Sequence, residues 1–234
     1  MDRAPYVGGA PLLADAVALD LANTHYAVRG RPREGLGSPA DVAAWAREIA
    51  PRLPGVDVAG LPHLAVEDRD VERFLELRAS VRAIAGDLVG GHVPAVSDTA
   101  VVNAAADRAP SSPALAITPE GVLTRRSRAA APLLDQILAG LAGDAVDLFA
   151  GERAARLRAC QAPGCPLFFL KDHPRREWCS PSCGNRVRAA RAYRKRTQRT
   201  TPSHGGELRA TSDQDGRRQE GRDGGMGSLH ENPA

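Results

Sequence analysis

Four cysteines lie within a stretch of twenty-four residues, and this cluster constrains the fold of the chain more than any other feature. They are arranged as Cys160-x4-Cys165 and Cys179-x3-Cys183, with thirteen residues between the pairs. A tetrahedral zinc ion needs four soft or borderline ligands, and two short-spaced cysteine pairs joined by a hairpin-length connection can supply them. We therefore predict a structural Zn²⁺ site whose ligands are Cys160, Cys165, Cys179 and Cys183.

Other uses of four clustered thiols are less favoured. Disulfides are unusual in a cytoplasmic chain, and we expect this location because residues 1–5 show no basic stretch leading into an apolar signal core. An iron–sulfur cluster or redox dithiol shares the ligand type, but the sequence has no Cys-x-x-Cys. A catalytic zinc is disfavoured because four Cys ligands leave no position for water. Clustered free thiols are the remaining alternative.

Charge divides the chain into three parts. Residues 1–150 have a net charge of −5, residues 151–200 a net charge of +10, and residues 201–234 a net charge of −2. The middle part has a polyanion-binding composition, whereas the last part has almost no apolar residues and is expected to be disordered. We therefore predict a first domain over 1–150, a zinc module over 151–200 and a disordered tail over 201–234.

The segment 184–199 is predicted to form a basic helix, because it carries seven basic residues and no acid. At 100° per residue, four of these basic residues fall within an arc of about 80°: Arg188, Arg191, Lys195 and Arg199. Val187, Ala190 and Tyr193 can turn toward the zinc module. Such a helix suits insertion into a DNA groove or seating along phosphates. Asn185 either caps the helix or reads adenine. The candidate nucleic-acid contacts are Asn185, Arg186, Arg188, Arg191, Lys195 and Arg199. The alternative is a solvated helix that docks on the acidic first domain.

The first domain is predicted to be helical, because aromatic residues make up only 4% of the chain and the core must use mainly Ala, Leu and Val. Apolar periodicity predicts helices beginning near Leu12 and ending near Asn23, and over 38–49, 67–89, 97–107 and 131–150. Ser38 is the expected cap of the second helix and Ser97-Asp98 that of the fourth. The last helix can continue through 152–158. A Pro/Gly turn predicts a small β-hairpin over 114–124.

Within the zinc module, residues 167–170 and 177–178 are expected to form the two strands of a hairpin. In the first domain, the polar cluster Asp20, Asn23 and Thr24 is a candidate effector pocket, although these residues can equally well lie on and end a helix.

No phosphate-binding glycine loop, nucleophile elbow or His-Glu-x-x-His occurs, so we assign no catalytic residues and expect no enzyme. No apolar run approaches the ~20 residues of a membrane span.

The residues Trp178-Cys179-Ser180 and Cys183-Gly184-Asn185-Arg186 resemble the signature of the CGNR zinc-finger family. The first part is similar to the ABATE domain that precedes this finger, through the run from Ala18 to Thr24 and the hairpin followed by a long Leu/Ala helix. This resemblance implies a bacterial, stress-induced transcription regulator whose finger binds DNA.

We therefore expect a mainly α fold, in which a helical domain with a small β-hairpin precedes a treble-clef-like, four-cysteine zinc module and its basic C-terminal helix. The predicted function is zinc-dependent binding of double-stranded DNA in transcription regulation. The alternative is a zinc-stabilised protein-interaction or RNA-binding module without sequence-specific DNA recognition. We expect no membrane partner. The sequence leaves open homo-oligomer formation and the identity of any small-molecule effector.

Overall fold

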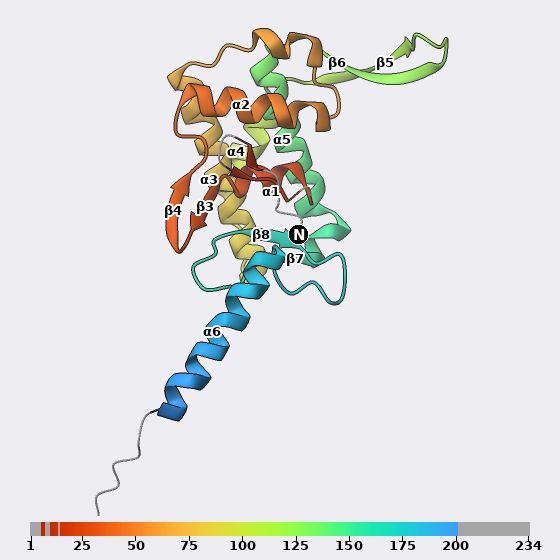
Figure 1. The fold of residues 1–234 in the computed structure, drawn as a ribbon. Coiled ribbons are helices and arrows are strands. Elements are labelled where there is room, and N and C mark those ends of the chain that lie inside the picture. The colour runs from red at the N-terminus through yellow and green to blue at the C-terminus, as the bar shows by residue number, and fades with distance from the viewer. Residues whose placement is uncertain (1–5, 8–9, 14, 201–234) are drawn as a thin grey trace, which may run out of the picture.

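A computed structural model describes residues 6–7, 10–13 and 15–200. The predicted tail over 201–234 lies outside the described residues. The helices are α1 (Val17–Ala22), α2 (Pro39–Ile49), α3 (Asp68–Gly90), α4 (Val96–Ala106), α5 (Leu133–Ala150) and α6 (Pro181–Thr200). Short 3₁₀ segments cover Ala50–Arg52, Val58–His63 and Glu152–Arg156. The described strands are β1 (Tyr6–Val7), β2 (Ala10–Pro11), β3 (His25–Val28), β4 (Arg31–Glu34), β5 (Ser111–Ile117), β6 (Leu123–Ala129), β7 (Leu157–Ala159) and β8 (Phe168–Leu170). Each strand pairs with one antiparallel neighbour, so the fold is mainly helical with small hairpins, as predicted (Figure 1).

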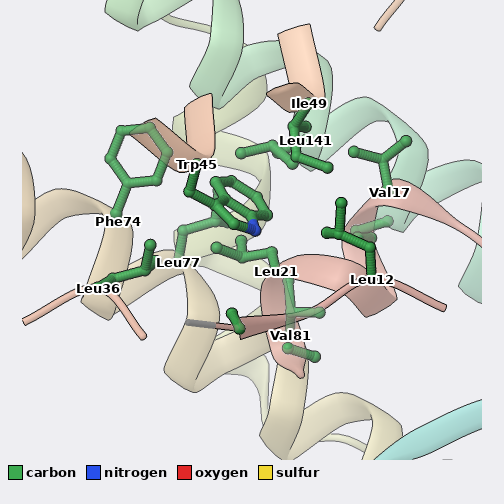
Figure 2. Packing of buried hydrophobic residues seen from close by; sticks show 14 of the residues in the cluster. Leu12, Val17, Leu21, Leu36, Trp45, Ile49, Phe74, Leu77, Val81 and Leu141 are labelled. Atoms are coloured by element: carbon green, nitrogen blue, oxygen red, sulfur yellow. The ribbon is translucent and has the colours of Figure 1, made fainter. Parts of the chain in front are cut away.

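The core lies where α1, α2, α3 and α5 meet. Trp45 of α2 is fully buried there and packs edge-to-face on Phe74 of α3, with ring centroids 6.3 Å apart. Figure 2 shows Leu21, Leu77 and other aliphatic side chains of these helices around the indole ring. The aliphatic and alanine-rich core that the composition predicts is confirmed, with two aromatic rings at its centre.

The predicted starts of α2 and α3 are confirmed. The Ser38 hydroxyl accepts the Asp41 N–H at 3.2 Å, and Pro39 occupies the first helical position, where its missing N–H costs nothing. At the start of α3, the Asp70 carboxylate accepts the Glu67 N–H at 3.0 Å. The helix ends at Gly90 and is capped by Gly91, which has φ +74°, a conformation that glycine adopts without a Cβ clash.

The first helix is shorter than expected. It begins at Val17, and its Ala18 N–H donates to the Asp144 carboxylate of α5 at 2.7 Å. The Leu13 N–H donates instead to Asp20 at 2.8 Å, so the chain turns before α1 rather than continuing the apolar helical pattern. These partners are distant in sequence, and periodicity alone does not reveal them.

Two further expectations about helix ends were wrong. Helix α4 begins at Val96 after Ala95, so neither Ser97 nor Asp98 is its cap. Helix α5 stops at Ala150, because Gly151 takes an extended conformation with ψ 175° and a 3₁₀ turn follows. The predicted hairpin is present but longer than 114–124: β5 and β6 pair from Ser111↔Ala129 to Ile117↔Leu123 and extend away from the helices (Figure 1).

The zinc module pairs its strands differently from the prediction. Strand β8 lies within the expected range 167–170, but its partner is β7, with Leu157 opposite Leu170, rather than 177–178. Leu157 is buried, and β7 directly follows the first part of the chain, so the strand before the first cysteine completes the hairpin. No helix in the described part of the chain is long and apolar enough to cross a bilayer.

Candidate metal centre and basic helix

The four cysteines converge at the junction of three elements. Cys160 follows β7, Cys165 precedes β8, Cys179 precedes α6, and Cys183 lies in the first turn of α6. All four sulfur atoms lie within 4.8 Å of one another. The Sγ atoms of Cys165 and Cys179 are 3.7 Å apart, those of Cys179 and Cys183 3.5 Å, and those of Cys165 and Cys183 3.7 Å.

These distances fit a tetrahedral zinc ion. With Zn–S bonds of about 2.3 Å, the edges of a tetrahedron of four sulfurs measure about 3.8 Å. A disulfide would require two sulfurs at about 2.05 Å, and all four cysteines are free. Cys160, Cys179 and Cys183 are buried, and Cys165 is partly buried. The donor set can therefore bind a zinc ion without rearrangement of the backbone.

The protonation of the cluster also favours a cation. Hydrogen bonds with Cys165, Cys179 and Cys183 hold the pKa of Cys160 far below its usual value. The same interactions with Cys160 raise the pKa of Cys165 and of Cys179. Against the opposing effect of Cys160, hydrogen bonds with Cys165 and Cys179 lower the pKa of Cys183 as well, to about 6. Once Cys160 and Cys183 are thiolates, loss of the other two protons is costly, because like charges crowd a partly buried site. A divalent cation removes that cost and allows all four sulfurs to be thiolates.

Glycine shapes both cysteine turns. Gly164 has φ +67° in the turn between Cys160 and Cys165, which favours a residue without Cβ. A Cβ on Gly184 would lie 2.9 Å from the Trp178 ring, so glycine after Cys183 allows the indole to pack against α6. One close contact therefore explains why Gly184 follows the second cysteine pair while Trp178 precedes it.

The structure places the six candidate nucleic-acid residues in different surroundings. Arg186 turns inward, and its Nη2 donates to the Cys183 sulfur at 3.1 Å. Asn185 lies in the second turn of α6 and accepts a hydrogen bond from Arg188, so its predicted capping role was wrong. Ser180 takes that place, since its hydroxyl accepts the Cys183 N–H at 3.4 Å.

Beyond Ala190 the helix is exposed. Every residue from Arg191 to Gln198 is exposed, and α6 projects from the body of the protein (Figure 1). Val187 is buried as expected, but Tyr193 is 66% exposed and does not reach the zinc module. Arg191 and Lys195 therefore face solvent. Arg199 belongs to the last turn of the same helix, where the side chains lie outside the described part.

Comparison with protein families gives two matches. The profile of ABATE, described as "Putative stress-induced transcription regulator", matches residues 15–152, more than half of the chain. The chain belongs to the ABATE family. A second profile, the CGNR zinc finger, matches residues 156–196 and contains all four cysteines. The comparison with curated proteins gives no match.

The ABATE region (residues 15–152) and the CGNR finger (residues 156–196) share one core. Cys160, Phe169 and Val187 of the finger belong to the same buried cluster as Trp45 and Phe74. Burying the finger's few apolar side chains against the ABATE helices overcomes the small size of its own core.

Hydrogen bonds reinforce this junction. The Asn23 side chain donates to the Phe168 carbonyl and accepts the Phe168 N–H, both at 2.9 Å. Arg82 donates to the carbonyls of Ala22 and Pro166, at 2.7 and 3.1 Å. Asp15 accepts the Leu170 N–H at 3.0 Å and pairs with Arg176 at 2.7 Å. The chain from Pro166 to Leu170 is thus held by Asn23 at the end of α1, by α3 and by the segment before α1.

These contacts also account for the residues of the candidate effector pocket. Asp20, Asn23 and Thr24 are fully buried. Asp20 pairs with Arg52 at 2.6 Å, and the Thr24 hydroxyl accepts from Arg78 at 3.1 Å and donates to the Leu21 carbonyl at 2.8 Å. The three side chains are therefore satisfied inside the protein, and an effector pocket formed by them stays a prediction. Sequence reasoning missed Asp15, Arg82 and Arg176, because no short motif signals their long-range partners.

Proposed function

We propose that this protein is a zinc-dependent DNA-binding regulator of transcription. In this proposal Cys160, Cys165, Cys179 and Cys183 hold Zn²⁺, and the exposed basic side chains of α6 contact DNA. The main support for this proposal is helix α6: it begins at the cysteine cluster, and its second half is basic and exposed. The match to a family described as a regulator supports the same function.

The charge pattern of α6 supports a polyanionic partner. Arg188 and Arg191 are three residues apart, Arg191 and Lys195 four, and like charges at these spacings each destabilise a helix by about 0.2–0.5 kcal/mol. Every residue from Arg191 to Gln198 is exposed, so burial of apolar surface contributes little against this repulsion. Phosphates of a nucleic acid would neutralise the charges and favour the helix, which continues for about 25 Å beyond Cys183 at 1.5 Å per residue.

The metal has a structural role in this proposal. Bound Zn²⁺ would link the turn before β8 to the first turn of α6, and four thiolates would close its coordination sphere. The protein's own residues fix the direction of the helix: Trp178 packs on Gly184, and Val187 is buried. The role is therefore binding rather than catalysis. Cys179→Ser should lower the bound zinc below one ion per chain.

We propose separate roles for the parts of the chain. Residues 1–150 sense a signal or mediate assembly, residues 151–200 contact DNA, and the tail over 201–234 lies outside the contacts described here. The hydrogen bonds between Asn23 and Phe168 support communication between the first two parts. The location that we propose is the cytoplasm of a bacterium, and the family description supports a role in the response to stress.

The test is a selection of fragmented genomic DNA by zinc-loaded full-length protein at near-physiological salt. Random duplex and RNA are present in excess as competitors. Discrete enriched sites that are lost in Arg191→Gln/Lys195→Gln support a DNA-reading regulator. A matched control is Arg108→Gln/Arg125→Gln, which removes the same charge from exposed positions of the ABATE region. Preferential competition by RNA favours the RNA-binding alternative, and no retention favours a protein-interaction module.

Salt dependence provides a second readout of the same proposal. If about four phosphates are neutralised, log affinity should fall against log salt with a slope near −3.6, from roughly −0.9 per phosphate. A flat response would remove α6 from the interface.

A further inference from the structure

The hairpin formed by β3 and β4 carries a second group of exposed arginines. It belongs to the ABATE region, and its two-residue tip is Arg29-Gly30, with φ +52° and +77°. Positive φ at both positions is the geometry of a tight hairpin turn. Arg29, Arg31 and Arg33 are exposed, and within the described part of the chain none of them makes an ion pair. The hairpin is therefore basic within a part of the chain that is acidic overall.

Other arginines of the ABATE region form ion pairs within the protein. Arg52 pairs with Asp20, Arg73 with Asp70, and Arg78 with Glu34 at 2.5 Å. The last of these pairs matters for the hairpin, since Glu34 is the one acid in the strands β3 and β4 and Arg78 already engages it. The charges of Arg29, Arg31 and Arg33 are thus left without a counter-charge from their own hairpin.

The hairpin lies directly beside the zinc finger. A Cβ on Gly164, in the turn between the first two cysteines, would approach Gly30 Cα to 3.3 Å. A cavity of about 250 Å³ separates the hairpin from the start of α6, with Val28 and Arg29 on one side and Ser182 and Arg186 on the other. The arginine-bearing tip and the first turns of the basic helix therefore border one concave surface.

Strand register places two more arginines beside this tip. Arg31 lies opposite Val28, and Arg33 lies opposite Tyr26. Cross-strand partners and alternate residues share one face of a β-ribbon, so Arg31 and Arg33 share a face with Val28 and Tyr26, two of the residues that line the cavity. Arg31 and Arg33 are thus exposed on β4 next to Arg29, and they extend the basic tip along the hairpin of the ABATE region.

We propose that the β3–β4 hairpin is a second phosphate-contacting element, which together with α6 forms a composite surface for duplex DNA. This inference rests on the proposed function of α6. Duplex DNA fits better than an acidic protein patch, because it presents one negative charge per about 1.7 Å of its axis and can follow a basic surface that spans two elements. The ABATE region is then part of the DNA interface as well as a partner of the finger.

The test compares three double variants of the full-length, zinc-loaded protein on one random-sequence duplex across a salt series. Arg31→Gln/Arg33→Gln probes the hairpin, Arg191→Gln/Lys195→Gln probes α6, and Arg108→Gln/Arg125→Gln is the charge-matched control. Residue 125 lies on the β5–β6 hairpin, at the opposite end of the molecule from α6 (Figure 1). If both hairpin contacts are lost, the salt slope should decrease in magnitude by about 1.8, and affinity at 0.1 M salt should fall by tens of fold.

The outcomes separate this inference from the proposed function. If the hairpin variant matches the control while the α6 variant loses slope, the composite surface is wrong and the proposed function of α6 stands. If the α6 variant also keeps the wild-type slope, both fail. Single-stranded RNA of equal length, run in parallel, distinguishes a general polyanion surface from one suited to a duplex; equal slopes and affinities on both would overturn the duplex assignment.

A second measurement uses the unmodified protein and does not depend on the folding of any variant. Phenylglyoxal labels accessible arginines, and mass spectrometry reports the labelled positions with and without duplex. We expect duplex to protect Arg29, Arg31 and Arg33, and to leave Arg108 and Arg125 reactive. Unchanged labelling of the hairpin at saturating duplex would refute the contact.

Discussion

Replacing Asn23 by alanine tests whether the ABATE region and the finger are held together by the paired hydrogen bonds to Phe168. Asn23 is fully buried, and its amide satisfies both the N–H and the carbonyl of Phe168 at 2.9 Å. Asn23→Ala leaves both backbone groups without that partner. A buried unsatisfied group costs about 1–3 kcal/mol, so the free energy of unfolding should fall by about 2–4 kcal/mol.

The assay is thermal and urea unfolding of the zinc-loaded protein at fixed free zinc. For a domain of this size, 1 kcal/mol corresponds to a Tm shift of about 2–4 °C, so the expected decrease is roughly 4–16 °C. Asn103→Ala is the matched control, because Asn103 is exposed on α4 and should change stability by less than about 0.5 kcal/mol. Equal Tm values for the two variants would refute the reasoning.

A second substitution sharpens this test. Asn23→Asp keeps an acceptor for the Phe168 N–H but places a carboxylate against the Phe168 carbonyl. Since a buried charge is costly, this variant should be less stable than Asn23→Ala at pH 7. If Asn23→Asp retains wild-type stability, the donor half of the pair contributes nothing.

Three further predictions concern the metal centre and one helix. Arg186→Ala should lower zinc affinity by about 10–100-fold in a chelator competition, because Arg186 donates to the Cys183 sulfur, and Arg186→Lys should recover part of it. Unchanged affinity in Arg186→Ala would contradict this role. Zinc binding at pH 7 should release at least two protons, since the pKa values of Cys165 and Cys179 are raised. Calorimetry in buffers of different ionisation enthalpy counts them, and release of none would contradict the assignment. Ser38→Ala should cost about 1 kcal/mol in urea unfolding through loss of the α2 cap; a loss below about 0.3 kcal/mol would show that the cap is unimportant.

Patterns within short stretches predicted much of this fold. The stripe over 67–89 predicted α3, and Ser38 with Pro39 predicted the start of α2. The four cysteines could be grouped from spacing alone, because short knuckle-like turns bring each pair together. In all these cases the interacting residues are close in sequence, so local periodicity and turn chemistry carry the information.

The errors have a common physical origin in long-range contacts. The start of α1 depends on Asp144, 126 residues away, and Asn23 meets Phe168 across 145 residues. The partner of β8 is β7 rather than residues 177–178. This pairing depends on how the finger packs on the ABATE helices. Arg186 looked like its basic neighbours in sequence, but its position one turn after Cys183 directs it to the sulfur. A helical wheel does separate the two environments, since Arg186 lies about 160° from Arg188 at 100° per residue, but it does not reveal that the sulfur is the partner.

The junction has a consequence for how a signal in the ABATE region could reach DNA. Strand β8 is bonded to Asn23 and Asp15 on one side of the junction, and Cys165 lies shortly before this strand on the other. The same sulfur cluster includes Cys183 in the first turn of α6. A shift of α1 must therefore either break the buried bonds to Phe168 or move a predicted zinc ligand, and with it the start of the basic helix. Because breaking those bonds costs several kcal/mol by the estimate above, we expect small displacements of α1 to be transmitted to α6.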